Sequence, residues 1–282
     1  MKEDDFVKDD KKKVLRQTAN QVRRGIIEAV YSAQSGHPGG SLSIADIMTY
    51  LYMEELRIDV SKPRWEDRDR LVLSKGHVCP ALYSMLAQKG FIPVEELKTF
   101  RRVGSRLQGH PDLNKCPGVD FTAGSLGQGV SAAAGIALAG KLSNKDYRVY
   151  AILGDGEIQE GQVWESAMFS AHNKLDNLCY IIDNNGLQID GNIAEVCSPY
   201  PIDEKFAAFG FEVICINGHD FDEIEAAFQK AKTIKGKPCA IVAKTTKGKG
   251  ISFMENQAGW HGSAPNKEQY DIAIADLEKE VF

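Results

Sequence analysis

Four short runs of apolar, largely β-branched or aromatic residues in the second half of the sequence restrict the fold most. They lie at residues 148–153, 178–183, 211–216 and 239–243. The segments between them, at about 161–174, 202–209 and 220–234, carry apolar residues at helical spacing. Strands of this kind separated by helices are typical of parallel βαβ units, in which helices cover both faces of the sheet. We therefore expect an α/β fold with a doubly wound, mainly parallel sheet flanked by helices.

The rest of the chain extends this pattern. Helices are predicted at 14–33, 42–56, 80–89, 125–141 and 266–281, and a short strand at 70–73. A chain of 282 residues is at the upper edge of what one core supports. We expect a charged N-terminal tail over residues 1–13 and a single domain over 14–282. The long, glycine-bearing segment 244–262 is typical of a binding loop or lid.

Composition argues against several classes of protein. The net charge is -5 with Lys and Arg scattered among Asp and Glu, so no basic face for nucleic acid is predicted. No window approaches the roughly 18 apolar residues of a membrane span, and the N-terminus lacks the apolar core of a signal peptide. No two cysteines form a C-x-x-C pair, which argues against zinc. We expect buried thiols in a cytoplasmic protein; the cysteines are Cys79, Cys116, Cys179, Cys197, Cys215 and Cys239.

Two polar clusters follow neighbouring predicted strands. Asp155 lies in GDG after the first run, and Asn185 lies in DNN after the second. Parallel strands present their carboxyl ends at one edge of the sheet, so we expect these side chains to lie close together. Oxygen ligands of modest charge suit Mg²⁺ or Ca²⁺, often with phosphate oxygens completing the shell. Gly154 and Gly156 let the main chain approach a phosphate. Either cluster alone is a common turn signal, but the pair at this spacing predicts a metal–diphosphate site.

Further motifs make the prediction specific. GDGEIQEG and DNNGLQIDG resemble a thiamine-diphosphate motif. The other motifs, in chain order, are SGHPGGSLS (35–43), LSKGH (73–77), QGHP (108–111), AGSLGQG (123–129), NGHD (217–220), TKGKGI (246–251) and WHG (260–262). Together they span nearly the whole chain, which resembles the N-terminal, diphosphate-binding half of transketolases.

The resemblance implies a set of site residues. The metal ligands would be Asp155, Asn185 and the main-chain carbonyl of Leu187. Glu160 would be an interface glutamate that couples the cofactor sites of a dimer. The cofactor contacts implied are His77, Gly124, Leu126, Gly156, Glu157, Asn185 and His261. The sequence departs from the common family pattern at Ser125, Asn184 and Glu157, where proline, aspartate and cysteine are frequent.

Four of the six histidines lie in glycine-flanked loops, which favour side chains that face a ligand over buried core histidines. By resemblance, His77 and His261 lie near the diphosphate and the reaction centre, while His37 and His110 meet the hydroxyls of a sugar. With Glu160, these four form the predicted catalytic set. His172 and His219 are predicted to be structural.

The resemblance also implies a function. Thiamine diphosphate supplies a nucleophilic carbon and an electron sink, so a two-carbon ketol unit would pass from a ketose phosphate to an aldose phosphate. A complete transketolase is more than twice as long as this chain, and its second half supplies the glutamate that activates the cofactor and the arginines that hold sugar phosphate. We therefore expect the N-terminal subunit of a split transketolase. It would work only with a C-terminal partner carrying the pyrimidine-binding and C-terminal domains, in a heterotetramer.

Two alternatives remain open from the sequence. One is a subunit of another thiamine-diphosphate enzyme, such as a deoxyxylulose-phosphate synthase-like or 2-oxoacid dehydrogenase alpha-like chain. Those families share GDG and the second asparagine but resemble this chain less at SGHPGG, QGHP and WHG. The other is a noncatalytic partner that binds the cofactor, against which the four loop histidines argue. The physiological sugar and the identity of the partner chain do not follow from the sequence.

Overall fold

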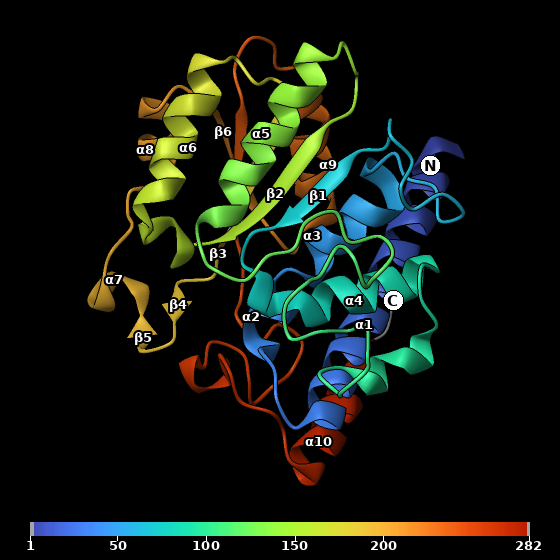
Figure 1. Cartoon of the computed structure of the whole chain (residues 1–282). Helices are drawn as coiled ribbons and strands as arrows, with labels where there is room; N and C mark the ends of the chain where they lie inside the picture. The colour runs from blue at the N-terminus through green and yellow to red at the C-terminus, as the bar shows by residue number, and fades with distance from the viewer. Residues whose placement is uncertain (1–2, 281–282) are drawn as a thin grey trace.

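A five-stranded parallel sheet forms the centre of the computed structural model, which describes residues 3–280 (Figure 1). Its strands are β1 (Arg70–Leu73), β2 (Val149–Gly154), β3 (Leu178–Asn184), β6 (Glu212–Asn217) and β7 (Cys239–Lys244). Every neighbouring pair in the sheet is parallel. The expected α/β class is confirmed, and each predicted strand lies within about one residue of its expected bounds.

The order of the strands is β1-β2-β3-β7-β6. The chain lays β1, β2 and β3 side by side, then crosses to the far edge as β6 and returns as β7 beside β3. The direction of winding therefore reverses between β3 and β7. In open α/β sheets, ligands bind outside the carboxyl ends of the strands at such a reversal.

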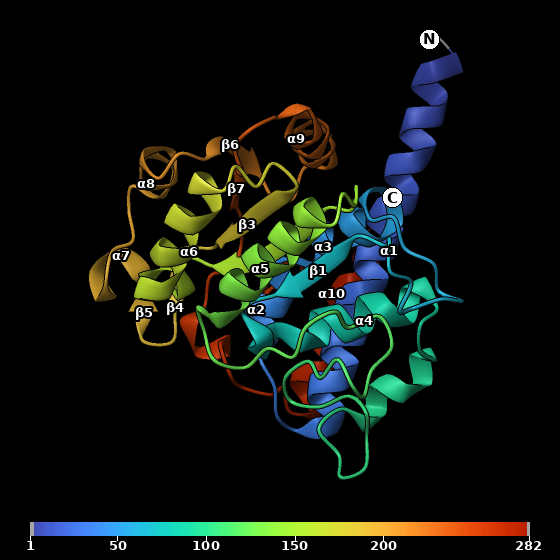
Figure 2. The same cartoon turned by 45° about the horizontal axis from the view of Figure 1, so that its top comes forward.

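Helices cover both faces of the sheet (Figure 2). On one face lie α1 (Glu3–Ala33), α3 (Ala45–Tyr50), α4 (Cys79–Lys89), α9 (Phe221–Thr233) and α10 (Lys267–Lys279). On the other lie α5 (Gln128–Leu142), α6 (Gly161–His172) and α8 (Ile202–Ala208). Successive residues of β2 alternate between the two cores, with Tyr150 and Ile152 on the first face and Ala151 and Leu153 on the second.

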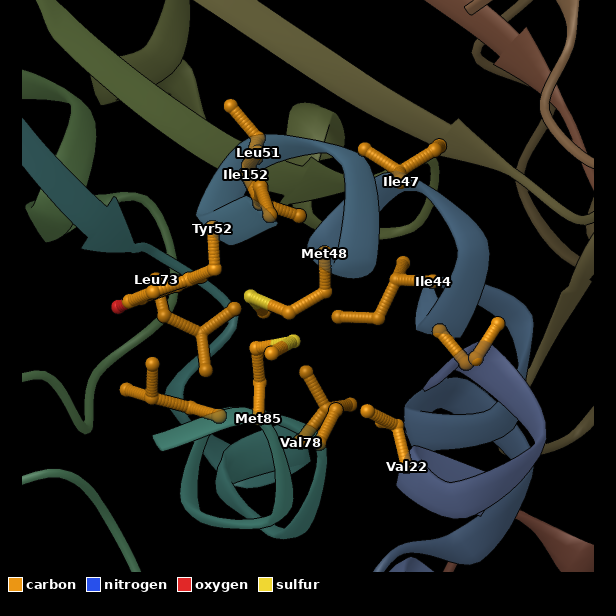
Figure 3. Close-up of a cluster of buried hydrophobic side chains, with 14 of the residues drawn as sticks. Val22, Ile44, Ile47, Met48, Leu51, Tyr52, Leu73, Val78, Met85 and Ile152 are labelled. Carbon is orange, nitrogen blue, oxygen red and sulfur yellow. The ribbon is translucent and has the colours of Figure 1, made fainter. Parts of the chain in front are cut away.

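The larger core fixes the segment that leads into the site. Met48 of α3 and Met85 of α4 meet between the helices, with Leu73 of β1, Val78 and Ile152 around them (Figure 3). All five side chains are buried. This packing anchors the short 3₁₀ turn Gly76–Val78 at the end of β1, and so places His77 at the edge of the sheet.

Several predicted helix bounds differ from the structure. The predicted helix 42–56 consists of α2 (Pro38–Ser43), α3 and a π-helical turn, Leu51–Glu55. The hydroxyl of Ser43 donates to Asp183, and Ile44 leaves helical geometry at the junction. Helix α5 begins at Gln128 because Gly127 has φ of +77°, a conformation suited to glycine. The predicted last helix reaches Lys279, and Val281 lies outside the described residues.

The predicted tail over residues 1–13 is helical from residue 3 onward, where it forms the first turns of α1. Figure 2 shows these turns extending beyond the rest of the chain. Within the described part of the chain, no helix is at once long and apolar enough to cross a membrane.

The cysteines are free thiols, and the expectation that they are buried is only partly right. Cys79, Cys116, Cys179 and Cys239 are buried, but Cys197 and Cys215 are exposed. Cys215 lies on β6, which is an edge strand of the sheet. The apolar run predicted a strand, but it did not show that this strand lies at the edge of the sheet. The exposure of Cys215 could therefore not be predicted from the run.

Candidate functional site

A cavity of about 380 Å³ opens at the carboxyl edge of the sheet. Residues that follow four different strands line it: Lys75 after β1, Asp155 after β2, Asn185 after β3 and Lys247 after β7. A short antiparallel hairpin, β4 (Leu187–Gln188) and β5 (Gly191–Asn192), also contributes residues to the wall. The cavity thus lies where the strand order predicts a ligand site.

The predicted proximity of the two polar clusters is confirmed. Strands β2 and β3 pair with Gly154 opposite Asp183, so the residues that follow them meet. The carboxylate of Asp155 accepts hydrogen bonds from the main-chain N–H of Gly156 at 2.9 Å and of Gly186 at 2.6 Å. Asp155 is therefore held between the two loops by main-chain donors.

Beneath these loops, Asp183 is fully buried and accepts four hydrogen bonds. Its donors are Lys75 Nζ at 2.5 Å, Ser43 Oγ at 2.6 Å, Asn185 Nδ2 at 2.9 Å and Thr245 Oγ1. Burial favours the neutral acid, but the charge of Lys75 and the hydrogen bonds hold the pKa of Asp183 below its usual value. The carboxylate therefore ties together the ends of β1, β3 and β7 and segment α2.

The oxygen atoms at the cavity fit a hard cation. Asp155, the side-chain oxygen of Asn185 and the carbonyl of Leu187 form a set of one carboxylate and two neutral oxygens, which suits Mg²⁺ or Ca²⁺. Burial and the nearby Asp183 raise the pKa of Asp155 to about 6, although the charge of Lys75 and the main-chain donors oppose this shift. Among the described residues, no group of three His, Cys, Asp or Glu side chains has metal-binding geometry. The neutral oxygens are therefore essential to any cation site here.

Two buried lysines line the cavity, and the sequence interpretation assigned neither a role. Lys75 and Lys247 are each 2% exposed. Lys247 Nζ lies 3.2 Å from the carbonyl oxygen of Leu187 and 2.9 Å from Nδ1 of His261. Burial and the charge of Lys75 lower the pKa of Lys247 to about 8. Each lysine follows a strand and lies in a loop next to a glycine. This position in the sequence could have predicted an anion-binding role for both.

Three of the predicted histidines form a cluster. The ring centroids of His37, His77 and His261 lie 5.0 to 5.5 Å apart. Burial, followed by nearby cations and the other imidazoles, lowers the pKa to about 4 for His37, about 2 for His77 and about 3 for His261. All three are therefore neutral near pH 7. Neutral imidazoles can accept or donate a hydrogen bond at either nitrogen, depending on the tautomer. Nδ1 of His37 is buried without a partner among the described residues.

The structure brings most of the predicted site residues to this cavity. Those that line it are His37, His77, Leu126, Asp155, Gly156, Glu157, Glu160, Asn185, Leu187 and His261. His110 and Gly124 do not line it. His110 is exposed, and Tyr83 Oη contacts its main-chain carbonyl at 3.2 Å. Partial desolvation of the ring and the charge of Arg101 lower the pKa of His110, and His110 in turn contributes to the lowered pKa of His37.

Glu157 and Glu160 have different environments although they are close in sequence. Glu157 is buried, and its carboxylate accepts from Ser74 Oγ at 2.6 Å and from the N–H groups of Gly127 and Gly154 at 3.0 and 3.1 Å. Its oxygens therefore brace the loops that surround the cavity. Glu160 is exposed at the rim.

His219 has contacts that fit its predicted structural role, whereas the role of His172 stays a prediction. Nδ1 of His219 lies 2.7 Å from Asp46, and its Nε2 accepts from the N–H of Thr246 at 2.9 Å. His219 thus connects α3 to the loop after β7. His172 is exposed at the end of α6.

Comparison with known proteins agrees with this geometry. Residues 14–277 match the family described as transketolase, thiamine diphosphate binding domain. The chain belongs to the transketolase family. It is similar, over almost its whole length, to two proteins named as transketolase subunits. It is 46% identical to the 6-deoxy-6-sulfo-D-fructose transketolase subunit SqwG of Clostridium sp. (strain MSTE9), covering 94% of this chain and 97% of that protein. It is 41% identical to an apulose-4-phosphate transketolase subunit of Phocaeicola vulgatus, covering 92% of each.

The chain spans less than half of longer transketolases. It is 41% identical to the transketolase of Mus musculus, covering 96% of this chain and 43% of that protein. Among solved structures, the transketolase of Campylobacter jejuni superposes with a TM-score of 0.89 at 37% identity. That match covers 94% of this chain and 43% of the Campylobacter chain.

Proposed function

We propose that this chain is the N-terminal, thiamine-diphosphate- and Mg²⁺-dependent subunit of a transketolase. It would transfer a two-carbon ketol unit from a ketose phosphate to an aldose phosphate together with a separate C-terminal subunit. The observation that carries the proposal is that one cavity joins the oxygen set around Asp155 to the cluster of neutral imidazoles. The first suits a metal-bound diphosphate and the second suits a sugar. Residues 14–282 would form one domain around both.

The cofactor would be held by groups that already converge. Asp155, the side-chain oxygen of Asn185 and the carbonyl of Leu187 would bind Mg²⁺, or Ca²⁺ in its place, with diphosphate oxygens completing the shell. Gly156 would contact the diphosphate, because it lines the cavity directly after Asp155. Lys247 would add positive charge close by. Thiamine diphosphate, when bound, supplies the nucleophilic carbon and the electron sink for the reaction.

The histidines would bind the sugar. Because His37, His77 and His261 are neutral near pH 7, each has a ring nitrogen that can accept a hydrogen bond from a substrate hydroxyl. His77 and His261 would lie next to the cofactor. His37 and His110 would meet sugar hydroxyls, His110 from the exposed side of the site.

A C-terminal partner would complete the site. Leu126 and Glu160 line the cavity yet remain exposed at its rim, where a second chain would contact them. The similar subunits from Clostridium and Phocaeicola support a separate C-terminal partner and, by extension, a heterotetramer. Those subunits are named for a sulfo-sugar and a sugar phosphate, so we propose that the substrate of this chain also carries an anionic group.

A coupled assay for ketol transfer from xylulose 5-phosphate to ribose 5-phosphate tests the proposal. The chain would be assayed alone and mixed with a candidate C-terminal subunit, in the presence of thiamine diphosphate and Mg²⁺. We expect activity only in the mixture. Activity of the chain alone would refute the need for a partner. A mixture that binds cofactor and forms a complex, but acts on a 2-oxoacid in place of any ketose, would favour another thiamine-diphosphate enzyme.

A further inference from the structure

A second cavity, of about 390 Å³, lies beside the loop that carries His110. Arg101, Arg102, Val103, Gly104, Gln108, Gly109 and Lys115 line it. Three of these residues carry a positive charge, and no Asp or Glu is among the lining residues that the structure describes. The balance of charge in this cavity is therefore strongly positive, although the whole chain has a net charge of -5.

The charges on this loop are neutralised selectively. Arg106, which does not line the cavity, forms a two-pronged ion pair with Glu96 at 2.5 and 2.6 Å. Arg102 and Lys115 are exposed and form no ion pair or side-chain hydrogen bond with any described residue. Arg101 has only neutral partners, Ser35 Oγ at 2.6 Å and the carbonyl of Gly109 at 3.5 Å. Its Nε is buried without a partner among the described residues.

Hydrogen bonds order the backbone of the loop that carries Arg101 and Arg102. The N–H of Arg101 donates to the carbonyl of Leu107 at 2.9 Å, and Arg101 has φ of +58°, which is uncommon for a residue with a side chain. Thr99 and Ser105 join their hydroxyls at 2.7 Å across the same turn. The backbone of this part of the cavity wall is therefore ordered before a ligand binds.

Arg101 connects the basic cavity to the histidine site. Its guanidinium donates to Ser35, which lies two residues before His37, and its charge helps to lower the pKa of both His37 and His110. Gly109, which lines the basic cavity, directly precedes His110, so an anion there would lie next to the loop that carries this histidine. Guanidinium groups match the geometry of oxyanions such as phosphate, and several cations favour an anion with more than one negative charge.

We propose that the cavity lined by Arg101, Arg102 and Lys115 binds a tetrahedral oxyanion of the phosphate or sulfonate class. The anion comes either from the charged end of the sugar substrate or from free phosphate. Binding of the charged end of a sugar rests on the proposed function, whereas binding of an anion as such does not. The cavity thereby gives this chain its own contact with the anionic part of a ligand.

The test uses the double variant Arg102→Gln/Lys115→Gln, which leaves Arg101 and the histidines unchanged. The matched control, Lys13→Gln/Arg16→Gln on α1, removes the same charges from exposed residues that line neither the main cavity nor the basic one. Inorganic phosphate is titrated calorimetrically into the full chain with thiamine diphosphate and Mg²⁺ present. We expect about ten-fold weaker phosphate binding in the cavity variant and no change in the control. Equal binding by wild type and cavity variant would overturn the proposal.

Kinetics of the assembled enzyme distinguish the two sources of the anion. If the sugar supplies it, the cavity variant raises KM for xylulose 5-phosphate about ten-fold and leaves KM for unphosphorylated xylulose unchanged. If free phosphate supplies it, added phosphate alters turnover in the wild type and not in the variant. A variant that only weakens association with the C-terminal partner would overturn the proposal, because the loop would then be a docking surface. If the assembly has no transketolase activity, the proposed function fails, and the phosphate titration still tests whether the cavity binds an anion.

Discussion

Asp183 accepts a hydrogen bond from the side-chain amide of Asn185 at 2.9 Å, and this bond determines which atom of the amide is free for a ligand. The nitrogen is committed to the buried carboxylate, so the oxygen remains on the cavity side, where it also accepts from the N–H of Leu187 at 3.1 Å. Groups behind a metal ligand commonly orient it in this way. The buried network under the site thus selects oxygen as the atom that Asn185 presents.

Asp183→Asn should destabilise the fold strongly. The substitution leaves Lys75 buried without its carboxylate at 2.5 Å, and breaking a buried pair on one side costs roughly 3–5 kcal/mol. Urea-induced unfolding of the chain measures the loss. Asp271→Asn is the matched control, because Asp271 pairs with Lys267 on the exposed face of α10 and should change the free energy of unfolding by at most about 0.5 kcal/mol. Similar losses in both variants would contradict the role given to Asp183.

Asp155→Asn should remove the effect of Mg²⁺ on cofactor binding. Asp155 supplies the single carboxylate of the proposed metal set, so we expect at least about ten-fold weaker binding of thiamine diphosphate in Mg²⁺. Chelation of the metal should weaken the wild type to the level of the variant and leave the variant unaffected. Asp190→Asn is the control, since Asp190 lines the same cavity but is exposed. Titrations of cofactor with and without EDTA provide the measurement, and an equal response of both variants would count against the proposed ligand set.

His110→Ala should affect the sugar and spare the cofactor. His110 lies outside the main cavity and is exposed, so its loss should raise KM for the ketose about ten-fold while the affinity for thiamine diphosphate stays constant. His172→Ala, at the exposed end of α6, should change neither quantity. Steady-state kinetics with the C-terminal partner, combined with cofactor titration, separates the two effects. If the variant instead bound thiamine diphosphate more weakly and kept the KM of the wild type, His110 would contact the cofactor and not the sugar.

The lowered pKa of His37 should make the fold less stable in acid. Burial, with Arg101 and neighbouring cations, lowers this pKa from 6.5 to about 4. Between these values the unfolded chain binds a proton that the folded chain does not, so the free energy of unfolding falls as the pH drops from 6.5 to 4. His37→Asn should therefore lose less stability over this window than the wild type. Denaturant titrations at several pH values measure the slopes, and identical slopes would show that His37 titrates normally in the fold.

The fold could be predicted from the sequence because each strand is a short apolar run bounded by helices. A run of this kind can form few structures other than a buried parallel strand. The same register brought Asp155 and Asn185 together, since the carboxyl ends of β2 and β3 must meet. Lys75 and Lys247 escaped prediction for a physical reason. Lysine is rarely buried, and only the positions of Asp183 and the loop carbonyls explain why it is buried here.

Other features depended on contacts that composition does not reveal. The predicted helix 42–56 is interrupted after Ser43, where the hydroxyl of Ser43 donates a hydrogen bond to Asp183, 140 residues further along the chain. The exposure of Cys215 follows from the place of β6 at the edge of the sheet, which the order of strands along the chain does not give. The unpaired charges of Arg102 and Lys115 became distinctive only when Arg106 was found to have its own carboxylate.

Two glycines of α5 should respond to alanine in opposite directions. A Cβ at Gly129 would lie 2.7 Å from the Cα and Oγ of Ser74, next to the main chain at the end of β1, whereas a Cβ at Gly135 would meet nothing within 4 Å. Gly129→Ala should therefore destabilise the chain by about 1–3 kcal/mol through overpacking. Gly135→Ala should stabilise it by about 0.5–1 kcal/mol, because alanine loses less backbone entropy in a helix. Urea unfolding of both variants of the isolated chain measures the difference. If Gly129→Ala were as stable as Gly135→Ala, the close approach of α5 to β1, and with it the placement of Glu157 between Ser74 and Gly127, would be wrong.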